Sequence, residues 1–133
     1  MATVHKEFVV EAPAEKVWAA LEDFQAVHQR LAKGFVTDSK PDGAEARVVT
    51  FANGTSAREI LVNSDAKTKR LAYAVVGSER ISHHNASAQV IAEGPNKSRF
   101  VWTADFLPNA IAPYIDAQMQ QGGEVMKRVL EAK

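Results

Sequence analysis

Glu59 is the residue whose type and setting most directly suggest chemistry. It lies in a segment of β-favouring residues, where strand alternation places it on one face with Ala57 and Leu61. If that face points inward, a carboxylate stands in an apolar space, where it could hydrogen-bond a ligand or act as a general acid or base. Burial would raise its pKa unless a cation pairs with it. The alternatives are a structural ion pair with Arg47 across the preceding hairpin, or a place on the outer face.

The length of the hairpin loop decides whether that ion pair can form. A loop made of Asn53 and Gly54 alone would pair Glu59 with Val48, whereas a three-residue bulged loop would pair it with Arg47. Both registers remain open from the sequence.

His84 is the second candidate, because alternation groups it with Ala86, Ala88 and Val90 on one strand face. An inward imidazole could donate to a ligand or shuttle protons, and the alternative is a satisfied histidine at the rim or an exposed one. Its neighbour His83 points to the opposite face, so the two cannot share a metal ion. No His-Glu-x-x-His pattern occurs, and we therefore expect no metal site.

Composition excludes several other chemistries. The chain has no Cys, which excludes disulfides, thiolate nucleophiles and cysteine-ligated metals. Its 16 basic and 16 acidic residues cancel, so no bulk charge attracts nucleic acid or an anionic membrane. Neither a Gly-x-Ser-x-Gly elbow nor a phosphate or dinucleotide loop occurs, and we expect no cofactor. The longest apolar run is six residues, far below the roughly 20 of a membrane helix, and a cytoplasmic location is expected.

Helices and strands that could position these residues are visible in the sequence pattern. A strand over Val4–Val10 precedes a helix over Pro13–Asp23 and a second short helix over Phe24–Ala32. Six further strands are expected at Phe35–Asp38, Glu45–Phe51, Thr55–Asn63, Arg70–Val76, Ser82–Ala92 and Arg99–Phe106. The turns between these six strands are short, which favours antiparallel neighbours.

The C-terminal part predicts one long helix over Tyr114–Ala132, about 30 Å in length. Its apolar stripe consists of Ile111, Ile115, Met119, Met126 and Leu130. Gly122 and Gly123 interrupt this helix at a cost of roughly 2 kcal/mol relative to alanine. They indicate a close approach to the sheet, space for a cavity, or a local break.

These elements predict an α+β domain covering residues 1–133, in which a seven-stranded antiparallel sheet curls around the long C-terminal helix. The inward strand faces and the helix stripe together would form the wall of an internal cavity. The residues expected to bind a ligand there are Glu59, Tyr73, His84, Trp102, Phe106, Ile115, Met119 and Gly122.

Several short motifs occur along the chain in this order: Pro13…Val17-Trp18, Arg47-Val48, Gly54 with Glu59, Glu79-Arg80-Ile81, and Trp102-Thr103-Ala104-Asp105-Phe106. Together they resemble the START/Bet v 1-like superfamily, whose fold is the helix-grip. The chain is most similar to its polyketide cyclase/dehydrase and lipid-transport group, which includes bacterial relatives of the plant abscisic-acid receptors. The resemblance implies a large cavity between the sheet and the C-terminal helix, and an apolar or amphipathic ligand.

The chain departs from the plant receptors at three places. The Phe51–Thr55 hairpin is too short to serve as their proline-containing gate. Glu79-Arg80-Ile81 replaces a latch that begins with His, and Thr37 stands near the position of their cavity lysine. We therefore do not expect hormone perception of that type.

The expected function is binding of a hydrophobic or amphipathic small molecule, as a carrier or sensor. One alternative is a cyclase/dehydrase-type enzyme that uses Glu59 or His84 as an acid or base. Another is a protein-interaction module. We expect a monomer or homodimer without nucleic-acid partners or stable membrane insertion. Several polar groups converging on an empty apolar pocket would favour catalysis, and a lone polar group would favour a binder.

Overall fold

The computed structural model describes residues 1–132. Its elements are β1 (Ala2–Val10), α1 (Ala14–Glu22), the 3₁₀ turn η1 (Phe24–Ala26), the π turn η2 (Val27–Leu31), β2 (Val36–Pro41), β3 (Ala46–Phe51), β4 (Ser56–Asp65), β5 (Arg70–Val76), β6 (His83–Gly94), β7 (Lys97–Leu107), the 3₁₀ turn η3 (Asn109–Ile111) and α2 (Ala112–Glu131).

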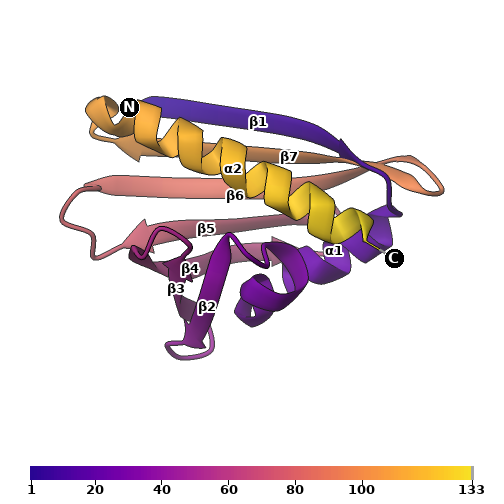
Figure 1. The fold of residues 1–133 in the computed structure, drawn as a ribbon, viewed down its shortest axis with the longest axis horizontal. Helices are drawn as coiled ribbons and strands as arrows, with labels where there is room; N and C mark the ends of the chain where they lie inside the picture. The colour runs from indigo at the N-terminus through magenta and orange to yellow at the C-terminus, as the bar shows by residue number, and fades with distance from the viewer. Residues whose placement is uncertain (133) are drawn as a thin grey trace.

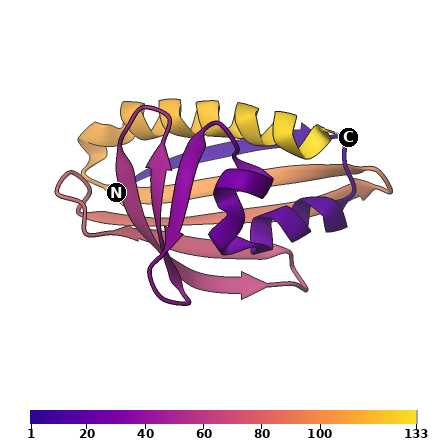
Figure 2. The same cartoon turned by 60° about the horizontal axis from the view of Figure 1, so that its bottom comes forward.

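The seven strands form one antiparallel sheet in the order β1-β7-β6-β5-β4-β3-β2, so the first strand lies beside the last. The sheet does not stay flat. Its β2–β4 end turns steeply toward α2, while the other strands run beneath the helix (Figures 1 and 2). This curled sheet around a long C-terminal helix confirms the helix-grip fold expected from the sequence.

Helix α2 lies along the concave face of the sheet (Figure 1). It begins two residues earlier than expected, at Ala112, and Pro113 occupies the first turn, where its missing N–H costs no hydrogen bond. The buried face of the helix comprises Ile115, Met119, Gly122, Gly123, Met126 and Leu130. The helix runs unbroken through the glycine pair, so a local break does not explain it.

The segment after α1 differs from the single short helix expected over Phe24–Ala32. It folds as a 3₁₀ turn followed by a π turn, which Ala32 closes by donating its N–H to the carbonyl of Val27 at 2.8 Å. The wider turn brings Val27, Leu31 and Ala32 into the core together. This gain in burial explains the departure from an ordinary helix.

Within residues 1–132, no helix combines the length and apolar character needed to cross a membrane.

Candidate ligand-binding site

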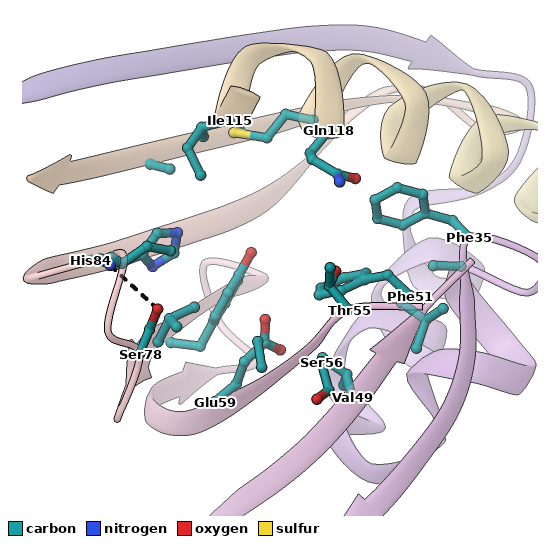
Figure 3. Close-up of a pocket in the computed structure, with 18 of the residues that line it drawn as sticks. Phe35, Val49, Phe51, Thr55, Ser56, Glu59, Ser78, His84, Ile115 and Gln118 are labelled. Carbon is teal, nitrogen blue, oxygen red and sulfur yellow. Dashed lines mark hydrogen bonds between the residues drawn. The ribbon is translucent and has the colours of Figure 1, made fainter. Parts of the chain in front are cut away.

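A cavity of about 370 Å³ lies between the sheet and α2. Figure 3 shows side chains directed into it from the strands, from Phe35 just before β2, and from the helix. Most of its wall is apolar, formed by Val27, Ala32, Phe35, Val36, Val49, Phe51, Ala57, Val75, Ile81, Ala104, Ile111, Ile115, Met119 and Met126. Its volume is in the lower part of the range for small-molecule sites.

The exposed members of the wall belong to three elements that meet at one end of the cavity. They are Thr55 and Ser56 at the β3–β4 hairpin, Arg80 in the β5–β6 loop and Tyr114 in the first turns of α2. The guanidinium of Arg80 lies 5.5 Å from the centre of the Tyr114 ring. This polar and aromatic rim is the entrance to the cavity from solvent.

Deep in the cavity, Arg47 on β3 and Glu59 on β4 form a buried ion pair. The loop between their strands has three residues. Gly54 ends it with a backbone φ of +88°, a value that residues other than glycine rarely adopt. Arg47 therefore stands opposite Glu59, which is the second of the two registers that the sequence left open. Its Nε and Nη2 lie 2.8 and 2.7 Å from Oε1 of Glu59, and each residue is 7% exposed.

Arg47 is also held by the segment that follows α1. Its Nη1 donates to the carbonyl oxygen of Phe24 at 2.6 Å, and its guanidinium stacks 3.8 Å from the centre of the Phe24 ring. The guanidinium is thus occupied on its face and on its edges. In contrast, Oε2 of Glu59 makes no hydrogen bond with any residue that the structure describes.

Tyr73 on β5 and Trp102 on β7 supply a second polar contact in the wall. Nε1 of Trp102 donates to the Tyr73 hydroxyl oxygen at 3.1 Å. Burial, together with the nearby carboxylate of Glu59, raises the pKa of Tyr73 well above its usual value. The phenol therefore stays protonated, and its O–H remains available to donate.

His84 on β6 faces the same space, 6.0 Å from the Tyr73 ring centre, and Figure 3 shows its ring and the Glu59 carboxyl both directed into the cavity. It is 8% exposed, and its Nδ1 is buried without a hydrogen-bond partner among residues 1–132. Burial lowers its pKa, although the charge of Glu59 opposes that shift. The imidazole is therefore neutral near pH 7.

The cavity wall contains most of the residues expected from strand alternation and from the helix stripe: Glu59, Tyr73, His84, Trp102, Ile115 and Met119. Phe106 and Gly122 do not line it. Phe106 is fully buried beside Ala2 and His84, where it packs the core beyond one end of the cavity. Alternation identified its face correctly, but how far the void extends along the strand depends on packing.

Gly122 and Gly123 allow the helix to approach aromatic side chains closely. A Cβ on Gly122 would lie 3.0 Å from the Phe35 ring and 3.3 Å from Trp102, and one on Gly123 would lie 3.1 Å from Phe8. Of the three explanations that the sequence allowed, close approach fits these distances. The glycines leave no cavity space of their own, because the rings already occupy it.

Sequence reasoning missed the entrance residues and the contribution of the segment around η2. Val27 lies in the π turn, Ala32 and Phe35 follow it, and all three line the wall. Tyr114 and Gln118 are four residues apart on α2, and this spacing could have placed them on one face beside the apolar stripe. No metal-ligand cluster of three or more His, Asp or Glu side chains occurs among residues 1–132.

Comparison with solved structures shows the same fold in proteins of low sequence identity. An uncharacterized protein from Bacillus thuringiensis superposes with a TM-score of 0.86 at 16% identity, over 98% of this chain and 100% of that one. A Thermobifida fusca protein solved by NMR reaches 0.80 at 27% identity, over 98% and 91% of the two chains. Truncated norcoclaurine synthase from Thalictrum flavum reaches 0.77 at 14% identity, over 99% and 95%.

No curated protein matches the sequence at a significant level. The family model described as polyketide cyclase/dehydrase and lipid transport, in contrast, matches residues 1–132. Family and fold together support a ligand-binding role and the START/Bet v 1-like assignment. The chain belongs to the polyketide cyclase/dehydrase and lipid-transport family.

Proposed function

We propose that this protein binds a hydrophobic or amphipathic small molecule in the cavity beneath α2, as a carrier or sensor. The observation that carries the proposal is a space of about 370 Å³ with an apolar wall, a few polar groups at depth and an entrance at one end. Such a combination is typical of small-molecule sites. The family supports the same role.

The test uses the two tryptophans as internal reporters. Trp102 lines the cavity, whereas Trp18 on α1 is buried outside its wall. The neutral fluorophore N-phenyl-1-naphthylamine should bind the folded protein at about micromolar concentration. It should quench the emission of a Trp18→Phe variant, which retains Trp102, far more than that of Trp102→Phe. Equal quenching of both variants, or binding only after partial denaturation, would contradict the proposal.

A second candidate function, acid–base catalysis, is favoured by one observation. The apolar cavity is lined by several polar side chains that could exchange a proton, namely Glu59, Tyr73 and His84, and not by a lone polar group. Arg47 holds Glu59 as an ion pair, which leaves the neutral imidazole of His84, with its unpartnered Nδ1, as the group that could accept a proton from a bound substrate. The substrate would be a polyketide-like or aromatic carbonyl compound whose α-proton His84 removes.

This second candidate is tested by proton exchange in a bound model ketone. The protein should accelerate deuterium incorporation at the α-carbon of 2-tetralone, followed by NMR, and His84→Gln should abolish the acceleration while tetralone still binds. Binding without acceleration would remove catalysis of this kind and leave the carrier role.

The third possibility, a protein-interaction module, has less support because the cavity is open rather than filled by side chains. A cytoplasmic location, the absence of nucleic-acid partners and a monomeric or homodimeric state stay predictions.

A further inference from the structure

The charges inside the cavity are already balanced before any ligand enters. Glu59 is the carboxylate in the wall, and Arg47 contacts its Oε1 through two nitrogens. The remaining edge of the guanidinium is taken by the carbonyl of Phe24. Arg80, the other cation of the wall, is exposed at the entrance. A charged group arriving at depth would therefore find no free counter-ion.

Glu59 and Tyr73 nevertheless each leave one hydrogen-bonding position open at depth. Oε2 of Glu59 accepts no hydrogen bond from residues 1–132, and a carboxylate oxygen can only accept. The Tyr73 hydroxyl accepts from Trp102 and keeps its own proton to donate. These two side chains thus leave one acceptor and one donor for a ligand, and the neutral imidazole of His84 beside them adds its unpartnered Nδ1.

We propose that the cavity selects ligands with a neutral head group that donates a hydrogen bond, namely a hydroxyl or phenol on an apolar body, and rejects carboxylates. The inference rests on the proposed binding function. A hydroxyl can donate to Oε2 of Glu59 and accept from Tyr73, which matches both open positions. It adds no charge to the balanced pair of Arg47 and Glu59.

Charged head groups fail for opposite reasons. A carboxylate would stand beside the Glu59 carboxylate in an apolar space, and like charges in such a setting strongly disfavour one another. An ammonium group would meet a carboxylate that Arg47 already neutralises, so its own charge would be buried without compensation. Electrostatics thus disfavour both the carboxylate and the ammonium head group. Burial of the ligand's apolar surface alone would not distinguish these ligands from a phenol with the same apolar body.

The experiment compares four naphthalene derivatives that share one apolar body, by calorimetry at pH 7. They are 2-naphthol, 2-methoxynaphthalene, 2-naphthoate and 2-naphthylmethylammonium. We expect 2-naphthol to bind at least tenfold more tightly than each of the others. The methoxy compound is the critical control because it is the most hydrophobic of the four, so binding by apolar contact alone would rank it first. A dissociation constant for naphthoate or methoxynaphthalene equal to or below that of naphthol would overturn the inference while leaving the binding function in place.

A charge-altering variant tests the role of Glu59 directly. In Glu59→Gln, Arg47 keeps its charge without a partner, so affinity for 2-naphthoate should rise at least tenfold and affinity for 2-naphthol should fall. Glu124→Gln, on the exposed face of α2, is the matched control and should leave the order unchanged. A folded Glu59→Gln protein that keeps the wild-type order would contradict the inference. If this variant does not fold, the four-ligand series on the wild-type protein decides alone. Failure of all four ligands and of N-phenyl-1-naphthylamine to bind would overturn the binding function and this inference together.

Discussion

The buried ion pair of Arg47 and Glu59 ties the floor of the cavity to the fold. It bridges β3 and β4, and through the Phe24 carbonyl it also fastens the η1 turn to the sheet. An ion pair at this depth is a constraint as much as a source of stability, because each charge depends on the other for compensation. A change at either residue therefore affects both stability and ligand choice.

We predict that Arg47→Met destabilises the protein by about 3 to 5 kcal/mol, because it leaves the buried Glu59 charge without a partner. Replacing both residues, as Arg47→Met with Glu59→Leu, should recover much of that loss. The adjacent Arg58–Asp42 pair is the control, since its side chains are 46% and 52% exposed. Arg58→Met should cost less than about 1 kcal/mol. Urea denaturation measures all three, and equal losses for the two single variants would contradict the buried-pair account.

His84 should make the stability of the protein sensitive to acid. Its folded-state pKa is lowered by burial, whereas in the unfolded chain it lies near 6.5. Below about pH 6.5 the unfolded chain takes up a proton that the folded site resists, so the free energy of unfolding falls until the pH reaches the folded pKa. The His84→Gln variant lacks this pH-dependent fall. The difference in free energy of unfolding between the wild type and the variant should therefore shrink as the pH drops.

His83→Gln is the matched control for that titration, because His83 is the exposed neighbour on the same strand. Its substitution should change the free energy of unfolding little at pH 7, because the side chain is exposed. A His84→Gln curve that runs parallel to the wild type would show that His84 is freely protonated in the folded state.

At the scale of residues, strand alternation grouped Glu59, Tyr73, His84 and Trp102 on faces expected to point inward, and all four line the cavity. The partner of Glu59 was not determined, because it depended on whether the hairpin loop has two or three residues. Alternation says which face a side chain takes. It cannot say where along the strand the packing leaves a void, which is why Phe106 was expected in the wall but lies in the packed core.

The elements differed in how well they could be recognised. The strands and both α-helices have clear periodic patterns and short turns, and they occur close to the expected bounds. The segment over Phe24–Leu31 has apolar residues at helical spacing, yet it adopts 3₁₀ and π turns because tertiary burial outweighs local preference.

Helix α2 offers a prediction at the scale of an element, through its two glycines. Alanine at either position should strengthen the helix by about 1 kcal/mol, while its Cβ presses on an aromatic ring. Gly122→Ala displaces Phe35 or Trp102, which line the cavity, so affinity for N-phenyl-1-naphthylamine should fall several-fold. Gly123→Ala displaces Phe8, which lies outside the wall, and affinity should stay close to that of the wild type.

Fluorescence titration of both glycine variants, alongside thermal unfolding, separates binding from stability. Equal affinity in the two variants would mean that the close approach of Gly122 does not shape the cavity.

At the scale of the whole molecule, the cavity follows from a geometric mismatch. The sheet turns at its β2–β4 end toward a helix that lies across the other strands (Figure 2). The concave space is wider than one helix can fill, and what the side chains leave unfilled is the cavity. Element order predicts this enclosure, but its volume depends on the packing of every side chain around it.

A ligand that fills this space should raise the free energy of unfolding of the protein. Our last prediction follows from this link between binding and stability. A ligand that binds only the folded state adds about 2.7 kcal/mol at a concentration 100 times its Kd. For a domain of this size the corresponding rise in Tm is on the order of 10 °C. Calorimetry of the wild type with saturating N-phenyl-1-naphthylamine should show that rise. In Ala57→Leu a larger side chain occupies part of the cavity, so the same probe should shift Tm far less, while the ligand-free Tm stays similar or increases. An equal rise in Tm in both proteins would mean that the probe binds elsewhere on the fold. That result would contradict the cavity beneath α2 as the binding site.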